Sequence, residues 1–156
     1  MDISVIILLF AEALLALAAA RGHRVCLNAS PVDEALLQAD LGGLAWLLIN
    51  RLEGAQLTGA EDPQAILDAL EARYPAMGVV LTLGREGAWC RTGGRRLFQP
   101  SFPARAVDTT GAGDAFLGAA LWQLRGLNRA QLEGLSPSAL AEIVDFANAA
   151  GALATT

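Results

Sequence analysis

The residues best suited to chemistry lie in the segment "TTGAGD" (109–114), where small residues and one acid precede an apolar run. Gly111, Ala112 and Gly113 leave their backbone N–H groups unobstructed by large side chains. The first N–H groups of a helix have no intrahelical partner and lie at the positive end of its dipole, which favours an anion such as phosphate. Beside that anion, Asp114 could take the proton of an alcohol while the N–H groups stabilise a transferred phosphoryl group.

Simpler interpretations of the polar residues stay open at this point. Asp114 could be a first-turn acid that only complements the helix dipole, an effect worth about 0.3–1 kcal/mol. Asn50 and Glu53 are three residues apart, so they would share one face of a helical turn. Taken alone, such a pair is more often a set of solvated polar residues than a binding site. The flanking sequence has to decide between these alternatives.

The composition excludes several classes of function. The formal net charge is −5, and the basic residues are all arginines, scattered except for Arg95 and Arg96, so we expect no nucleic-acid partner. The absence of lysine excludes a GxxxxGK[ST] phosphate-binding loop. Cys26 and Cys90 lie far apart in apolar, strand-like settings, so we expect reduced core thiols, a cytoplasmic protein and no structural zinc site.

Alternating strand-like and helix-like segments must position these residues. Apolar runs of strand length recur at 4–10, 23–28, 44–50 and 78–84. Helices are expected at 62–75, 113–125 and 136–154, with a hairpin around the glycine turn at 92–94. Buried strands separated by helices indicate one α/β domain, 1–156, with a mainly parallel sheet covered by helices on both faces.

Helical spacing predicts an apolar stripe on the 113–125 segment, and we expect this stripe and the tryptophans to lie in the core. These residues are Phe116, Leu117, Ala120, Leu121, Leu124, Trp46, Trp89 and Trp122.

The N-terminal segment 3–22 is strongly apolar but is interrupted by Glu12. It also lacks a basic leader, so we interpret it as a buried strand followed by a helix that ends at Gly22. A membrane or targeting role is the alternative, although no uncharged apolar run reaches the roughly 18 residues of a membrane span. We therefore expect no membrane association.

Five blocks of sequence resemble one family in the order that the family shows. "VDTTGAGDAFLGA" (107–119) closely resembles the C-terminal signature of the ribokinase-like (PfkB) family of carbohydrate kinases. The family's other blocks are matched by 21–40, by "LLINRLEGAQLTG" (47–59), by "VVLTLGREGAW" (79–89) and by "VDFANAAGALATT" (144–156). The resemblance implies a three-layer ribokinase-like α/β fold and ATP-dependent phosphorylation of a sugar hydroxyl.

The resemblance also implies roles for individual residues. Asp114 would be the general base on the sugar hydroxyl, and Gly111, Ala112 and Gly113 would form the anion hole. The remaining implied positions concern the nucleotide and its ions. Thr82 and Gly84 would line the nucleotide site, Asn148 would lie near adenine, Asn50 and Glu53 would organise the phosphates and hydrated Mg²⁺, and Asp108 would help to bind a monovalent cation such as K⁺.

The chain departs from the family pattern chiefly in what it lacks. Members are about twice as long, and the N-terminal half that supplies the sugar-binding aspartate, a glycine-rich substrate loop and a sheet lid is not recognisable here. We therefore expect an incomplete form that self-associates or needs that N-terminal half. A non-catalytic nucleotide-binding or interaction module is the alternative. Within the family, the loop "LNASP" (27–31) slightly favours ribokinase over fructokinase or adenosine kinase.

Overall fold

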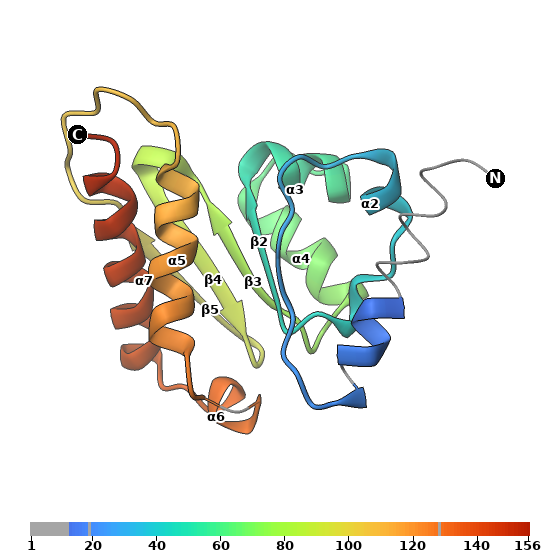
Figure 1. Ribbon diagram of the computed structural model, residues 1–156. Coiled ribbons are helices and arrows are strands. Elements are labelled where there is room, and N and C mark those ends of the chain that lie inside the picture. The colour runs from blue at the N-terminus through green and yellow to red at the C-terminus, as the bar shows by residue number, and fades with distance from the viewer. Residues whose placement is uncertain (1–12, 19, 128) are drawn as a thin grey trace. The chain divides into compact units, whose positions relative to one another are not determined.

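The computed structural model of the chain describes residues 13–18, 20–127 and 129–156 (Figure 1). The predicted strand 4–10 lies outside the described residues. The chain divides into two compact units, 1–79 and 80–156, which are described in turn. Among the described residues, no helix combines the length and the apolar character needed to cross a membrane.

The first unit follows the predicted order of strands and helices. Residues 13–18 are helical, and the chain leaves this helix through Gly22, as the sequence predicted. The remaining elements are β1 (Cys26–Asn28), α2 (Glu34–Gln38), the 3₁₀ turn η1 (Leu41–Gly43), β2 (Trp46–Asn50), α3 (Arg51–Thr58) and α4 (Pro63–Arg73). β1 and β2 are parallel, with Cys26 opposite Trp46. Short, parallel, apolar strands of this kind are typical of an α/β sheet.

The core of the first unit forms around β2 and α4. Residues 46–49 of β2 are all buried, as expected for a continuous apolar strand. α4 begins at Asp62, whose carboxylate accepts the N–H groups of Gln64 and Ala65, with Pro63 at the first helical position. The apolar face of α4 is buried through Ile66, Leu67 and Leu70.

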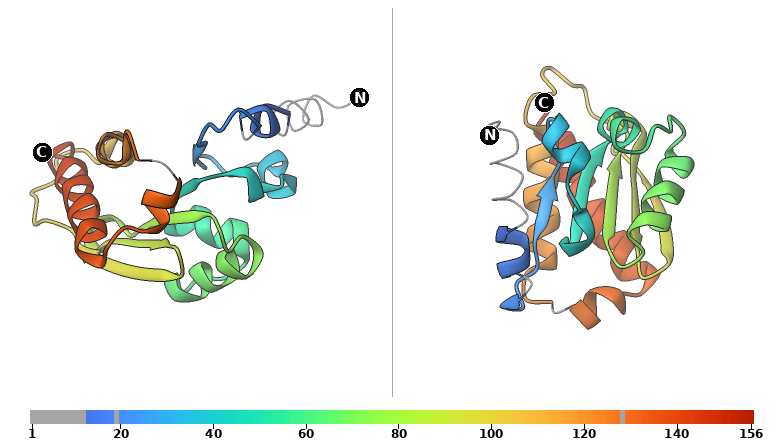
Figure 2. Two further views of the ribbon diagram at one scale, coloured as in Figure 1. Left: turned by 90° about the horizontal axis from the view of Figure 1, so that it is seen from below. Right: turned by 90° about the vertical axis from the view of Figure 1, so that its right-hand side faces the viewer.

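The second unit consists of a hairpin and two long helices. β3 (Gly78–Thr82) leads through the 3₁₀ turn η2 (Gly84–Glu86) into β4 (Gly87–Thr92) and β5 (Arg95–Pro100), which pair antiparallel. α5 (Ala112–Leu124), the short α6 (Arg129–Glu133) and α7 (Pro137–Leu153) follow, and α6 is an element that the sequence did not predict. α5 and α7 pack side by side, and α7 also packs on the hairpin (Figures 1 and 2).

The five strands follow the order β1-β2-β3-β4-β5 in one mixed sheet. β1 and β2 pair parallel, as expected for an α/β sheet, and the predicted hairpin around 92–94 is present as the antiparallel β4–β5 pair. The predicted α/β class is therefore confirmed.

The expected core assignments are only partly correct. Phe116, Ala120 and Leu124 are buried, but Leu121 and Trp122 are 40% and 58% exposed. α7 packs on α5, but Leu121 and Trp122 remain exposed. Helical spacing groups apolar residues on one side of a helix, but it does not show whether another element packs against each of them. The Arg125 guanidinium instead stacks on Trp122, 3.4 Å from the ring centre.

The other tryptophans and the cysteines also divide between core and surface. Trp46 is buried, whereas Trp89 is half-buried and packs against Phe98 with ring centres 5.1 Å apart. Cys90 is a buried free thiol, and its burial raises its pKa to about 12. Cys26 is also free but exposed, so the expectation that it is a core thiol is wrong. It is the first residue of the three-residue strand β1, where apolar neighbours in sequence do not guarantee cover.

Gly87 fixes the start of the β4–β5 hairpin. Its φ of +128° is one that residues with a side chain rarely adopt. A Cβ at this position would lie 2.1 Å from the carbonyl oxygen of Gln99 and 2.8 Å from the Cα of Pro100. Both atoms belong to the backbone of the paired strand, so they cannot move aside without disrupting the ladder.

Replacing Gly87 with alanine is expected to lower the free energy of unfolding by about 2–4 kcal/mol, because it adds both a clash and backbone strain. Chemical denaturation of the purified chain would measure this change. Gly118→Ala is the matched control, since Gly118 is helical and a Cβ there has no neighbour within 4 Å. The control should stay neutral or gain about 0.5–1 kcal/mol. Equal stability of the two variants would contradict the close approach at Gly87.

Candidate functional site

The N-terminus of α5 differs from those of the other long helices. α3, α4 and α7 begin at Asn50, Asp62 and Ser136, and each of these side chains accepts a backbone N–H group of the first turn. α5 begins at Gly111, which has no side chain to do so and takes a left-handed φ of 79°. The first turn of α5 is thus left uncapped by side chains, at a position where glycine suits the backbone.

Open space surrounds this helix start. A Cβ at Gly111 or at Gly113 would have no neighbouring atom within 4 Å. The N–H group of Ala112 donates to the carbonyl oxygen of Thr109 at 3.2 Å, which closes the turn before the helix. Asp114 is exposed in the first turn. The predicted anion-hole residues and the predicted base therefore stand together around an accessible, positively polarised helix terminus.

α7 holds this terminus in place through residues that the sequence did not single out. Gly151 is buried, and a Cβ there would lie 3.3 Å from the carbonyl oxygen of Ala112, so α7 approaches α5 closely at its first residue. The carbonyl oxygen of Thr155 accepts the N–H groups of Val107 and Asp108 at 2.7 and 3.2 Å. The glycine at position 151 of a mainly apolar helix was the available signal in the sequence. Thr155 gave no such signal, because it binds the loop through its backbone oxygen.

Asp108 organises the loop that precedes α5. Its carboxylate accepts the N–H group of Thr110 at 2.8 Å. Hydrogen bonds from the backbone and side chain of Thr110 hold the pKa of the Asp108 carboxyl below its usual range. This is the geometry of a loop-capping acid, which was the simpler interpretation of this residue. Its predicted role at a monovalent cation stays a prediction.

Thr82 and Gly84 lie where β3 ends, in the same unit as α5. Thr82 is the last residue of β3 and is half-buried. Gly84 opens η2 with a φ of 59°, and a Cβ there would have no neighbour within 4 Å. Ligands of open α/β sheets bind at the carboxyl ends of strands, which is the position of both residues.

Asn148 is buried in α7 and is already engaged by the protein. Its Nδ2 group donates to the carbonyl oxygens of Gln99 and Pro100, both at 3.2 Å. These bonds attach the end of β5 to α7. Its predicted place near adenine stays a prediction, and the structure adds a role that the sequence did not suggest.

A mainly apolar pocket of about 380 Å³ lies just beyond Asn148 along the chain. The segment Phe102–Arg105 forms one wall, and Ala149, Ala152 and Leu153 of α7 form the other. Alanines at this spacing leave a flat slot on the helix surface. The sequence gives no sign of this pocket, because the 102–105 segment has no motif of its own.

Asn50 and Glu53 belong to the first unit and bind each other. The Asn50 N–H group donates to Glu53 Oε2 at 2.7 Å, and the Glu53 N–H group donates to Asn50 Oδ1 at 2.9 Å. This reciprocal pair is a capping box at the start of α3. Glu53 is only 6% exposed, whereas Asn50 is exposed, so the simpler interpretation of solvated polar residues fits Asn50 but not Glu53.

The metal-ligating residues predicted from the sequence do not form a protein cage. Among the described residues, no group of three or more His, Cys, Asp or Glu side chains could hold a metal ion. Mg²⁺ commonly keeps several waters and binds through one or two carboxylates and substrate phosphates, so single acids suit it. The predicted Mg²⁺ role of Glu53 is compatible with this mode of binding, and it stays a prediction.

The whole described chain matches one family. The family model described as "pfkB family carbohydrate kinase" matches residues 9–156. The chain belongs to this family. The resemblance carried by the five sequence blocks is thereby confirmed, and with it the ribokinase-like fold.

Individual PfkB relatives include enzymes with different sugars in their names. The 2-dehydro-3-deoxygluconokinase of Bacillus subtilis is 39% identical over 116 residues, which is 73% of this chain and 32% of that protein. The fructokinase of Klebsiella pneumoniae is 33% identical over 127 residues, covering 80% and 38%. The chain thus spans about a third of the length of these relatives.

Solved structures show the same partial coverage. The fructokinase of Vibrio cholerae O395, in a form with fructose, ADP and calcium bound, superposes with a TM-score of 0.77 at 27% identity. The match covers 92% of this chain and 48% of that one. The fold of this PfkB chain therefore corresponds to about half of a carbohydrate kinase of known structure.

Replacing Glu53 with alanine is expected to lower the free energy of unfolding by about 1–2 kcal/mol, because the N–H group of Asn50 loses its acceptor. Glu53→Gln keeps an acceptor oxygen at the same place and should stay within about 0.5 kcal/mol of the parent chain. Denaturant titrations of both variants would test this. An equal loss in both would show that the negative charge, and not the capping geometry, stabilises α3.

Proposed function

We propose that this chain is the nucleotide-binding and catalytic portion of an ATP-dependent sugar kinase. The observation that carries the proposal is the uncapped start of α5, with an exposed carboxylate in its first turn and open space before it. Membership of the PfkB family supports the same reaction. The relative from Vibrio cholerae was solved with fructose and ADP, the acceptor and the spent donor of such a reaction.

In the proposed reaction, Asp114 acts as the general base. It takes the proton of the acceptor hydroxyl as the hydroxyl oxygen forms a bond to the γ-phosphorus of ATP. The bond between that phosphorus and the bridging oxygen breaks in line, and ADP leaves. The N–H groups at the start of α5 stabilise the charge on the transferred group, because the helix orients them before the reaction begins.

We assign the nucleotide to the second unit. The apolar slot between 102–105 and α7 suits a flat base, since its walls are an aromatic residue, a proline and small side chains. Asn148 lies one residue before this slot and fixes the end of β5 beside it. Thr82 and Gly84, at the end of β3, are assigned to the nucleotide on the strength of the family motif.

The ions of the proposed reaction are assigned to single carboxylates. Mg²⁺, when bound with the nucleotide, would neutralise phosphate charge. On the strength of the family motif alone, Asn50 and Glu53 are assigned to the phosphates and to hydrated Mg²⁺, a mode of binding that single carboxylates suit. Asp108 is the candidate for a monovalent cation such as K⁺, because the lowered pKa keeps its carboxylate charged.

A non-catalytic nucleotide-binding module is the second candidate function. The observation that favours it is coverage, because the chain spans only 32% and 38% of the two relatives described above. None of the described residues carries a proposed role in sugar binding. Since a kinase must also hold the acceptor in position, a nucleotide site without a sugar site would bind ATP without efficient transfer.

Asp114→Asn is expected to abolish sugar phosphorylation while ATP binding is retained, because asparagine keeps the size of the side chain and removes the base. The measurement is turnover together with ATP affinity, made in this chain complemented by the N-terminal half of a relative. Glu142→Gln, at an exposed acid on α7, is the matched control and should leave turnover unchanged. Retained turnover in Asp114→Asn would reject the base role.

The chain by itself is expected to bind ATP but to phosphorylate sugars only at trace rates. The reason is that the acceptor sugar would not be held next to the γ-phosphate. Binding would raise the melting temperature, since saturation at about 100 times the dissociation constant stabilises the folded state by about 2.7 kcal/mol. Thermal denaturation with and without ATP and Mg²⁺ measures the first effect, and product assays measure the second. No shift would contradict the nucleotide site, and efficient phosphorylation would contradict the need for a further half.

The purified chain is also expected to self-associate. Leu121 and Trp122 are substantially exposed on α5, the helix that carries Asp114, and an apolar surface of this kind is commonly covered in a functional assembly. Either a second copy or the rest of a longer kinase would cover it. Sedimentation analysis should show species larger than one chain, and Trp122→Gln should weaken them. A strictly monomeric chain would contradict the expectation.

A further inference from the structure

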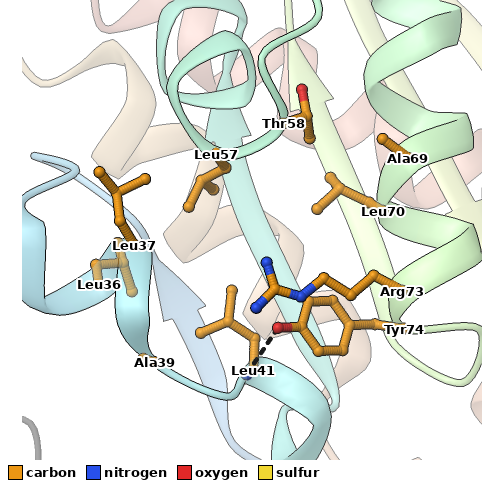
Figure 3. A pocket seen from close by; sticks show the side chains of 10 residues that line it. All are labelled: Leu36, Leu37, Ala39, Leu41, Leu57, Thr58, Ala69, Leu70, Arg73 and Tyr74. Carbon is orange, nitrogen blue, oxygen red and sulfur yellow. Dashed lines mark hydrogen bonds between the residues drawn. The ribbon is translucent and has the colours of Figure 1, made fainter.

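A pocket of about 160 Å³ lies inside the first unit (Figure 3). α2 and the η1 turn line one side, and α3 and α4 line the other. Its walls are mostly aliphatic, with Leu41, Leu57 and Leu70 contributed by three different elements. None of the residues assigned to the kinase site lines this pocket, so it is not explained by the proposed function.

Arg73 is the charged side chain among the described residues that line the pocket. Its guanidinium lies 5.1 Å from the centre of the Tyr74 ring and extends from α4 into the pocket (Figure 3). The Tyr74 hydroxyl oxygen accepts the N–H group of Leu41 at 3.3 Å, which fixes the ring between α4 and η1. The hydroxyl of Thr58 donates to the carbonyl oxygen of Gly54 at 2.7 Å, so its hydrogen bond is made within α3.

These features define the chemistry of an occupant. One cation beside aliphatic walls selects a ligand with a single anionic group and an apolar body, because uncompensated polar groups are costly to bury there. The planar fork of an arginine matches the two oxygens of a carboxylate. A cavity of roughly 150 Å³ accommodates a benzene-sized molecule. We propose that this pocket binds a small monocarboxylate whose apolar body contains about five or six carbon atoms.

The position of Arg73 suits a ligand that enters from solvent. Arg73 is exposed, whereas Tyr74 and Leu41 are buried. The carboxylate would therefore remain at the entrance, and the apolar body would occupy the interior against Leu57 and Leu70. Arg73 also stands in the last turn of α4, where its charge offsets the negative end of the helix dipole that would otherwise repel an anion.

Titration of the complete chain with 4-methylpentanoate, followed by the methyl resonances of leucine in NMR spectra, would test the proposal. Ligand would be added to about ten times a dissociation constant on the order of 1 mM, the strength expected for so few atoms. The uncharged 4-methylpentan-1-ol has the same carbon skeleton and serves as the control ligand. The carboxylate is expected to shift resonances of Leu41, Leu57 and Leu70 and to bind at least ten-fold more tightly than the alcohol.

Two variants separate the charge from the cavity. Arg73→Gln should weaken the carboxylate at least ten-fold and leave the alcohol unchanged. Ala69→Leu, which adds bulk to a residue lining the pocket, should weaken both. Arg24→Gln removes an exposed arginine that does not line the pocket and should change neither.

Three results would overturn the proposal: no shift with the carboxylate, equal affinity for acid and alcohol, or unchanged carboxylate affinity in Arg73→Gln. The amide spectrum reports whether each variant is folded. If Ala69→Leu does not fold, Arg73→Gln and the alcohol still decide the outcome. ATP binding plays no part in the readout, so failure here would leave the proposed kinase function unaffected.

Discussion

The close packing of α7 on α5 is the constraint on which the second unit depends. A helix start without a side-chain cap has unsatisfied N–H groups, and something else has to hold it in position. Gly151 lets α7 approach the first residue of α5, and the Thr155 carbonyl oxygen binds the loop that leads into it. α7 thus holds the start of α5 in position, and the N-terminal end of α5 remains accessible to an anion.

The two units use their helix starts in opposite ways. In the first, Asn50 and Glu53 satisfy each other's backbone groups, and the result is a closed, self-sufficient cap. In the second, Gly111 has no side chain to cap the first turn and takes a left-handed backbone conformation. Both arrangements are encoded by short motifs to which the family resemblance gives functional roles. Only the second is difficult to explain by stability alone, because an uncapped helix is less stable than a capped one.

Sequence reasoning predicted most of the architecture and part of the site. Apolar runs and caps such as Asp62–Pro63 located the strands and long helices, since these signals are local. Exposure was harder to predict, because it depends on what lies opposite a residue. Cys26 and Trp122 are apolar in sequence but exposed in the structure. The role of Thr155 could not be predicted for a different reason. Its backbone oxygen accepts the hydrogen bonds, and every residue type has such an oxygen.

Asn148 has a consequence for how this surface can vary among related sequences. Its two hydrogen bonds end on backbone carbonyl oxygens, which every amino acid possesses. Residues 99 and 100 can therefore change their side chains without losing the attachment, whereas position 148 has to keep a donor of similar reach. A hydrogen bond from a side chain to a backbone oxygen restricts the choice of residue only at the position that supplies the side chain, here position 148. It leaves the segment that follows β5, and with it the wall of the apolar slot, free to diversify on a fixed frame.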